Sequence, residues 1–278
     1  MPSHPRRPRQ PCPQGLGHVQ QIEGWLSEPS LLMLPTLLTA GATEKELVGI
    51  MGGHKAPQGK WSWQVSLKVY SYHWAAWWVL TAAHCIHQNA DPETYWIQAG
   101  DIYLYGDQKL LSVSQIIVHP DFVCAHLGAD VALLRLATAP TRTSQVPVGD
   151  GRGLCTSTAA TSCSPPPPGW LPPPFRLQEV NVQVVENSLC EEVYQNASRH
   201  HLHRRIILDD MLCAGIFIIS FPPQGDSGGP LVCKVRGSWT LVGVVSWGYG
   251  CGWHDIPGVY ARVQTYVPWI QQQIHSSS

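Results

Sequence analysis

Short apolar runs separated by glycine and proline dominate the chain and predict strands. Apolar and polar residues alternate over 60–69 (K-W-S-W-Q-V-S-L-K-V), which is typical of a strand with one buried face. The segment A-D-V-A-L-L at 129–134 indicates a buried strand. Further strands are expected over 177–185, 231–235, 239–247 and 258–262. The pattern favours an all-β barrel or sandwich.

Two helices are expected beside these strands. A short helix starts within 188–194, and 267–274 places Trp269, Ile270 and Ile274 at helical spacing near the C-terminus. No apolar run approaches the ~20 residues that cross a bilayer, so we expect no membrane span.

Composition narrows the compartment and the partners. Charged residues make up 13% of the 278 residues and the formal net charge is −1, which argues against a nucleic-acid partner. Nine cysteines indicate an oxidising compartment, and their odd number leaves at least one unpaired in a monomer. Asn196-Ala197-Ser198 is a glycosylation sequon, which agrees with secretion if it is modified and is otherwise an ordinary loop.

The first 42 residues predict a disordered leader. Proline and arginine are frequent at its start, and residues 31–42 form a short apolar stretch that ends in A-G-A, as a secretory signal does. Because this stretch begins only at residue 31, either translation starts internally at Met33 or the segment has no targeting role. Residues 43–49 then form a short propeptide ahead of a folded domain at 50–275.

The motif Q-G-D-S-G-G-P at 224–230 carries the main chemical signal. Ser227 on a tight glycine turn is a candidate nucleophile, and the N–H groups of Gly225 and Ser227 are expected to hold an oxyanion. Such a serine needs a base and an orienting acid. His84 in T-A-A-H-C and Asp130 in A-D-V-A-L-L are the candidates, although an isolated aspartate there is otherwise a cap or turn residue.

These motifs, with K-W-S-W-Q-V-S-L, V-S-W-G and P-G-V-Y-A-R-V, resemble the chymotrypsin family of serine peptidases over about residues 49–275. Within it the chain is most similar to tryptases, mastins and implantation serine proteinases. The resemblance implies two antiparallel six-stranded-type β-barrels, over about 50–145 and about 146–275, with a C-terminal helix. It implies peptide hydrolysis through an acyl-enzyme, a secreted protein, and no metal or cofactor.

The resemblance also implies activation by cleavage before Ile50. I-M-G-G at 50–53 is similar to the mature N-terminus of the family, whose freed amine pairs with the acid before the serine, here Asp226. Such a buried ion pair orders the oxyanion loop. Relatives carry Arg or Lys ahead of the cut, whereas this chain has Gly49, so an ordinary trypsin-like activator is not expected to process it.

The first barrel is expected to lack a strand. Relatives carry a strand with a cysteine just before W-V-L-T-A-A-H-C, and this chain is too short there to contain it. Cys85 has therefore lost the partner that the family provides. An unclosed barrel exposes unpaired edges, and a lost disulfide lowers stability.

Other cysteines retain family partners by resemblance. Cys190 matches a cysteine that bonds the counterpart of Cys213. The partner of Cys233 is either Cys155 or Cys163, because counting from the two sides of the intervening proline run gives different answers.

The substrate pocket departs from the trypsin type. In the run I-F-I-I-S-F-P-P, Phe221 stands where such relatives carry the acid that selects Arg or Lys, so the pocket is expected to be apolar or blocked. Ser246, Trp247 and Gly248 resemble the edge that pairs with an extended substrate, and Gly258 keeps the pocket wall open.

The segment R-H-H-L-H-R-R, from Arg199 to Arg205, is basic and rich in histidine. The histidines suggest a metal and the charge suggests a polyanion, but no nearby carboxylate or cysteine completes metal-ligand spacing. A solvated loop is the plain interpretation, and polyanion contact is the better of the two binding hypotheses.

Two functions remain open. The first is a secreted serine endopeptidase that uses His84, Asp130 and Ser227. The second is an impaired or inactive homologue, either a binding module on the same scaffold or a degenerate product. The lost strand, the lost disulfide partner, Phe221 and Gly49 support the second.

Overall fold

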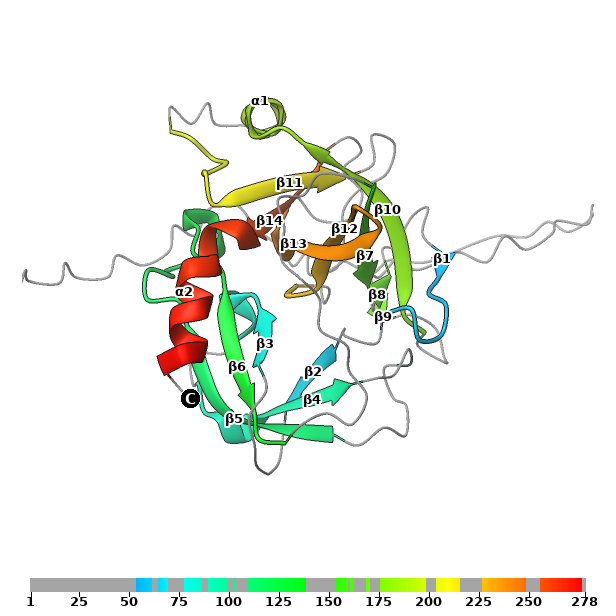
Figure 1. Ribbon diagram of the computed structural model, residues 1–278. Helices are drawn as coiled ribbons and strands as arrows, with labels where there is room; N and C mark the ends of the chain where they lie inside the picture. The colour runs from blue at the N-terminus through cyan, green and yellow to red at the C-terminus, as the bar shows by residue number, and fades with distance from the viewer. Residues whose placement is uncertain are drawn as a thin grey trace, which may run out of the picture. The chain divides into compact units, whose positions relative to one another are not determined.

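The computed structural model describes residues 54–61, 65–69, 78–86, 90–99, 103, 110–138, 154–159, 161–162, 169–170, 176–198, 204–215, 227–248 and 256–276 (Figure 1). All of them belong to one compact unit, Leu47–Ser278.

Six antiparallel strands form a closed barrel in the C-terminal part of the chain. They are β7 (Leu154–Ala159), β10 (Gln178–Val185), β11 (Met211–Gly215), β12 (Pro230–Val235), β13 (Ser238–Trp247) and β14 (Gly258–Arg262). The order is β10-β11-β14-β13-β12-β7, and pairing of β7 with β10 closes the ring. Closure leaves no unpaired edge among these strands.

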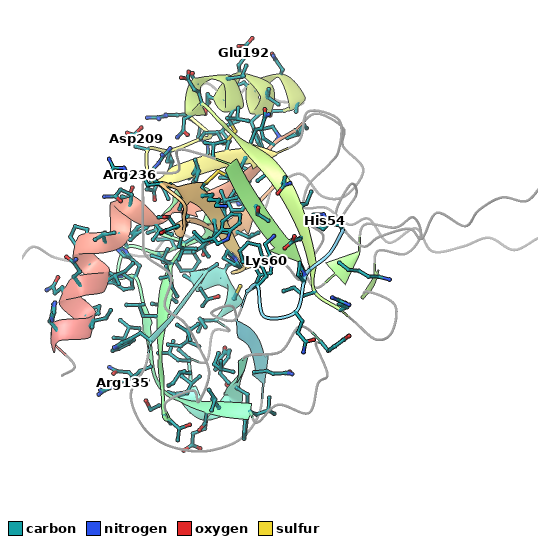
Figure 2. All side chains as sticks on the ribbon, turned by 45° about the vertical axis from the view of Figure 1, so that its right-hand side comes forward. His54, Lys60, Arg135, Glu192, Asp209 and Arg236 are labelled. Carbon is teal, nitrogen blue, oxygen red and sulfur yellow. A yellow bond between two sulfur atoms is a disulfide. The ribbon has the colours of Figure 1, made fainter. Side chains whose placement is uncertain are left out.

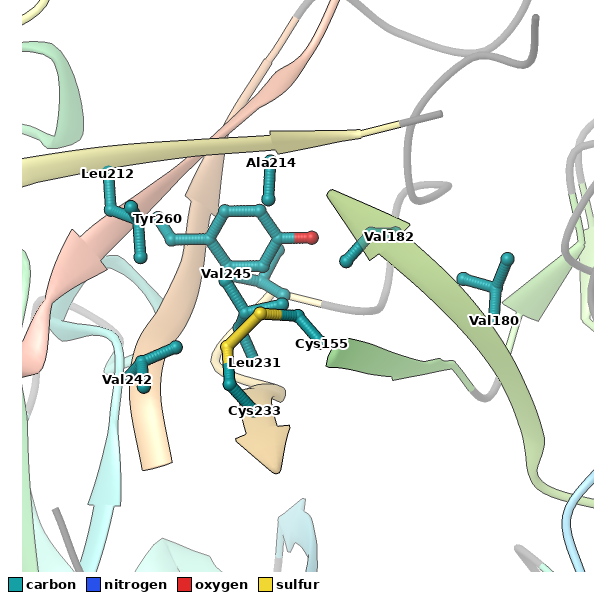
Figure 3. Packing of buried hydrophobic residues seen from close by; sticks show 10 residues of the cluster. All are labelled: Cys155, Val180, Val182, Leu212, Ala214, Leu231, Cys233, Val242, Val245 and Tyr260. Atoms are coloured by element: carbon teal, nitrogen blue, oxygen red, sulfur yellow. A yellow bond between two sulfur atoms is a disulfide. The ribbon is translucent and has the colours of Figure 1, made fainter. Parts of the chain in front are cut away.

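The interior of the closed barrel is apolar. Figure 3 shows the ring of Tyr260 among side chains that include Ala214 and Val245, beside the disulfide between Cys155 and Cys233. Alternate residues of each strand point inward, so the spacing of apolar residues in the sequence determines which of them reach this core.

A second sheet, formed by the N-terminal strands, is open. It contains β2 (Val65–Val69), β3 (Trp78–Thr81), β4 (Tyr95–Ala99), β5 (Leu110–Val118) and β6 (Ala132–Leu136). Their order is β2-β4-β5-β6-β3, so β2 and β3 are the two edges. Among the described residues this sheet has five strands and two open edges, in agreement with the predicted loss of one strand from the first barrel.

The chain length explains why this sheet does not close. Only eight residues separate Val69 at the end of β2 from Trp78 at the start of β3. A bridging strand of typical length, about five residues, with a tight turn of about two residues at each end needs more than this.

The described residues contain two α-helices beside the sheets. α1 spans Asn187–Ala197 and α2 spans Val263–Ser276. α2 begins four residues before the predicted range and includes Pro268, and its first turn carries Tyr266. No helix in the described ranges is long and apolar enough to cross a membrane.

Glu179 anchors the segment that precedes the open sheet. β1 (His54–Lys55) pairs with β10, which places His54 opposite Glu179. Glu179 is 2% exposed, and it accepts hydrogen bonds from Nζ of Lys60 at 2.7 Å and Nε1 of Trp61 at 2.5 Å. Nε2 of His54 lies 2.7 Å from the same carboxylate (Figure 2 labels His54 and Lys60). A buried carboxylate with three donors is a fixed point of the fold.

Five shorter elements lie in the described residues. β8 (Thr161–Ser162) pairs with β9 (Gly169–Trp170), and the proline run 165–168 lies outside the described residues. Short 3₁₀ helices occur at Ala83–Cys85 (η1), Pro92–Thr94 (η2) and Ala125–Leu127 (η3).

Candidate active site

Strand pairing brings His84 and Asp130 together. β3 pairs with β6 so that Thr81 lies opposite Ala132, and both residues of interest sit just outside this ladder. The backbone N–H of His84 donates to Oδ1 of Asp130 at 2.9 Å, and Nδ1 of its ring lies 2.7 Å from Oδ2. Two contacts from one residue fix both the position and the plane of the imidazole.

Asp130 is buried, with 1% of its surface exposed, and it is hydrogen-bonded from the closed barrel as well. The hydroxyl of Ser246, on β13, donates to Oδ2 of Asp130 at 2.5 Å. A carboxylate this deeply buried is costly unless its oxygens are hydrogen-bonded, and these three contacts supply the donors. The site therefore draws on both sheets.

Ser227 lies on the turn that enters β12, and its side chain is exposed. The next residue, Gly228, has a φ of +79°. A Cβ there would approach Oγ1 of Thr81 to 2.3 Å and Sγ of Cys85 to 3.1 Å, so only glycine fits. The turn that carries Ser227 thus packs against the segment that carries His84.

The backbone of this turn is tied to β13. The N–H of Gly228 donates to the carbonyl of Val245 at 2.9 Å, and the N–H of Val245 donates to the carbonyl of Gly229 at 2.8 Å. These two bonds hold the turn beside Ser246, which contacts Asp130. The glycines of the motif thus permit close approach, as their spacing predicted.

No hydrogen bond joins Ser227 to His84 among the residues that the structure describes. Nε2 of His84, the nitrogen that faces away from Asp130, lies 3.9 Å from Sγ of Cys85. Cys85 is half-buried and its thiol is free, in agreement with the loss of its family partner. The thiol therefore lies beside Nε2, the nitrogen that would accept the proton of Ser227 if His84 acts as its base.

The imidazole of His84 favours its charged form. Burial alone lowers the pKa of His84, but the hydrogen bond to Asp130, the contact with Cys85 and the negative charge of the carboxylate together raise it to about 10. At neutral pH His84 is therefore an imidazolium paired with a buried carboxylate.

Two rings near the site were not predicted from the sequence. His126, on η3, stacks on Trp247 with ring centroids 4.5 Å apart, and Tyr194 meets Trp247 edge-on at 5.2 Å. Burial lowers the pKa of His126 despite the nearby charge of Asp130. Only the position of His126, four residues before Asp130, hinted at this contact.

The remaining predicted site residues divide into two groups. Gly248 follows β13, Gly258 begins β14, and Asn196 is exposed on α1. Outside the described residues lie Ile50, Phe221, Gly225, Asp226 and the segment 199–203.

Disulfides brace the closed barrel. Cys155 and Cys233 face each other across β7 and β12 and are bonded, so of the two sequence alternatives the structure contains the one with Cys155. Cys190 on α1 is bonded to Cys213 on β11. Cys124 is also disulfide-bonded.

Comparison with known proteins agrees with this architecture. Residues 50–270 match the family described as Trypsin. The chain is 41% identical over 249 residues to "Serine protease 28" of Mus musculus, covering 82% of this chain and 89% of that protein. It is 43% identical over 246 residues to "Tryptase" of Mus musculus, covering 81% of this chain and 89% of that protein.

Proposed function

Because the chain belongs to the trypsin family of serine peptidases, we propose that it is a secreted endopeptidase that cleaves peptide bonds through Ser227, His84 and Asp130. The observation that carries the proposal is the buried carboxylate of Asp130, which meets Nδ1 of His84 at 2.7 Å and the hydroxyl of Ser246 at 2.5 Å. A buried acid that holds one imidazole nitrogen leaves the other able to act as a base once that nitrogen is deprotonated.

Each residue has a defined role in this mechanism. The oxygen of Ser227 attacks the peptide carbonyl while Nε2 of His84 takes its proton, and a new C–O bond forms. The N–H groups of Gly225 and Ser227 stabilise the negative carbonyl oxygen. His84 then gives the proton to the leaving amine as the C–N bond breaks, and water hydrolyses the acyl-enzyme by the reverse sequence.

Substrate binding would use the edge of β13. Ser246, Trp247 and Gly248 present backbone groups to an extended peptide, and Gly258 leaves the pocket wall open. With Phe221 at the base, the pocket would accept an apolar side chain rather than Arg or Lys. Activation would require a cut between Gly49 and Ile50, after which the amine of Ile50 pairs with Asp226.

Secretion and modification complete the proposal. The two described intrachain disulfides support an oxidising compartment, and the exposed position of Asn196 on α1 suits glycosylation. In the basic segment that ends at Arg205, Arg204 and Arg205 are exposed, which supports polyanion contact. Nη2 of Arg205 lies 2.5 Å from Asp209, however, so this pair presents less net positive charge to a polyanion.

An inactive homologue is the second candidate, and specific observations favour it. The first sheet is open at β2 and β3, Cys85 has no disulfide, and Nε2 of His84 contacts Sγ of Cys85 at 3.9 Å with no hydrogen bond to Ser227 among the described residues. A displacement of ~1 Å can reduce a rate about 100-fold. Such a protein would keep a binding surface on β13 without turnover.

One experiment separates these functions. The full chain is secreted with an engineered cleavage site before Ile50, cut, and treated with a serine-directed phosphonylating probe. Labelling of the wild type that is lost in Ser227→Ala supports the peptidase. A folded, cleaved and unlabelled wild type refutes it and supports the binding module, whereas failure to secrete any variant supports a degenerate product.

A further inference from the structure

The backbone that leads into Asp130 is held in a strained conformation. Gly128 has a φ of +81°, and the next residue, Ala129, has a φ of +54° although it carries a Cβ. A non-glycine residue keeps such a conformation only where its surroundings hold it. The carbonyl of Ala129 also accepts from the N–H of Val131 at 2.8 Å, so the chain turns tightly around Asp130.

Two side chains of the C-terminal region hold this strained turn. The N–H of Ala129 donates to Oδ2 of Asp210 at 2.8 Å and lies 3.0 Å from the hydroxyl oxygen of Tyr266. The Tyr266 hydroxyl itself donates to Oδ2 of Asp210. The three groups form a closed triangle that joins the open sheet to α2 and to the start of β11.

The triangle is rigid on its outer side. The backbone N–H of Arg262 donates to the backbone carbonyl of Asp210 at 2.8 Å, and this bond fixes the position of Asp210. Tyr266 is 5% exposed, and its ring meets His119 edge-on at 5.3 Å. A Cβ on Gly128 would lie 2.4 Å from Oδ2 of Asp210, so the carboxylate packs directly against the glycine.

The phenol of Tyr266 is held in its protonated form. Burial and the adjacent Asp210 carboxylate raise the pKa of Tyr266 well above its ordinary value. The phenol therefore stays protonated across the working range of pH and serves as the donor to Asp210.

The direction of the Asp130 carboxylate depends on this anchoring. Only the Ala129–Asp130 peptide separates the held N–H from the residue whose two oxygens receive His84 and Ser246. Rotation about Ala129 would swing both oxygens away from their donors. We propose that Asp210 and Tyr266 are positioning residues for Asp130: they fix Ala129 in its left-handed conformation and so aim the carboxylate at His84.

The proposal rests on the proposed function of the triad, and its test includes a readout that does not need turnover. The pKa of His84 is measured by NMR titration of its ring proton in the full chain. Tyr266→Phe keeps the ring and removes the hydroxyl. Asp210→Leu removes the acceptor, whereas Asp210→Asn keeps an oxygen at the same place and serves as the conservative rescue. Tyr260→Phe is the matched control, because it removes a buried hydroxyl that donates to Ser157 at 3.4 Å in the barrel core.

We expect the pKa of His84 to fall from about 10 toward its ordinary value of 6.5 in Tyr266→Phe and further in Asp210→Leu, with Asp210→Asn closest to the wild type. Where the cleaved chain is active, kcat should fall about 10-fold to 100-fold with KM unchanged. Tyr260→Phe should leave both unchanged.

The proposal is overturned if Tyr266→Phe and Asp210→Leu fold and keep the wild-type pKa of His84, even if they are less stable. It is also overturned if Tyr260→Phe shifts that pKa equally. If Asp210→Leu does not fold, Tyr266→Phe and Asp210→Asn decide by the same measure. A wild type that never turns over refutes the peptidase proposal, while the NMR titration still decides the positioning role.

Discussion

Nδ1 of His84 lies 2.7 Å from Oδ2 of Asp130, and the same carboxylate accepts the backbone N–H of His84 at 2.9 Å. One residue thus contacts both oxygens of a carboxylate that is 1% exposed. The pairing holds the imidazole in place and also stabilises its protonated form. A histidine with such a partner acts as a base only when the pH is high enough to remove the proton from its other nitrogen, Nε2.

Phosphonylation of Ser227 should depend steeply on pH. Since the pKa of His84 is raised to about 10, the neutral base is scarce at pH 7. The labelling rate of the cleaved chain should rise about tenfold per pH unit between pH 7 and 9 and level off near pH 10. Asp130→Asn should move the midpoint to lower pH and lower the plateau. A wild-type plateau already at pH 7 would contradict this coupling.

Ser246→Ala removes one donor from Asp130. A hydrogen bond to a charged group contributes about 1.5–3 kcal/mol, so the free energy of unfolding at pH 7 should fall by about that amount. The control is Ser157→Ala. Ser157 is also buried, but its hydroxyl accepts a long, neutral hydrogen bond from the hydroxyl of Tyr260 at 3.4 Å. Denaturant titration of both variants measures the difference. Equal losses in the free energy of unfolding would show that the hydrogen bond to Asp130 contributes no more than the neutral bond to Ser157.

Chemical modification of Cys85 should slow the reaction of Ser227. Its free, half-buried thiol lies 3.9 Å from Nε2 of His84, and a Cβ on Gly228 would come within 3.1 Å of it. Alkylation with iodoacetamide should place an added group against the imidazole and the turn that carries Ser227, and slow phosphonylation at least about 10-fold. Cys85→Ala, treated in the same way, should keep its rate. Complete alkylation without loss of labelling would exclude this arrangement.

The disulfides Cys155–Cys233 and Cys190–Cys213 should differ in their effect on stability. Cys155–Cys233 spans 78 residues and Cys190–Cys213 spans 23. A disulfide that closes a longer loop removes more conformational entropy from the unfolded state. The double variant Cys155→Ala/Cys233→Ala should therefore lower the free energy of unfolding by about 1 kcal/mol more than Cys190→Ala/Cys213→Ala does. Denaturant unfolding of both gives the comparison. The opposite order would point to strain or packing rather than loop entropy.

Glu179 should contribute to stability at neutral pH and lose that contribution in acid. Burial raises its pKa, but the hydrogen bonds and charges of Lys60, Trp61 and His54 lower it below its ordinary value of 4.5 overall. A lowered folded-state pKa stabilises the protein above pH 4.5, and this stabilisation disappears as the pH falls through the folded-state value.

Glu179→Gln should therefore lower the free energy of unfolding by about 1.5–3 kcal/mol at pH 7, and the gap to the wild type should shrink below pH 4.5. Glu192→Gln, at an exposed glutamate on α1 that is labelled in Figure 2, is the control and should change little. A gap that stays constant into acid would contradict the assignment.

Sequence reasoning predicted the parts of the fold that depend on local pattern or on counting. The strands at 177–185, 231–235, 239–247 and 258–262 are present within a residue or so, because each alternation fits one barrel wall. The missing strand was predicted from the family resemblance, because relatives carry a strand ahead of W-V-L-T-A-A-H-C that this chain is too short to contain.

The parts that sequence reasoning missed depend on contacts between distant segments. Asp210 and Ala129 are 81 residues apart and Glu179 and Trp61 are 118 apart, and no local pattern couples them. The choice of Cys155 over Cys163 was open because the proline run made counting ambiguous, whereas the register of β7 against β12 places Cys155 opposite Cys233. Tyr266 was missed because the helix was expected to start after it.

The anchoring of His54 by Glu179 has a consequence for any activating cut. Ile50 is four residues upstream of His54, and four extended residues reach at most about 14 Å. The amine liberated by the proposed cleavage is thus tethered within a sphere of that radius around a fixed centre. Glu179 therefore restricts the positions that the new amino terminus can reach to pair with Asp226. An N-terminal segment without this anchor would be restricted far less.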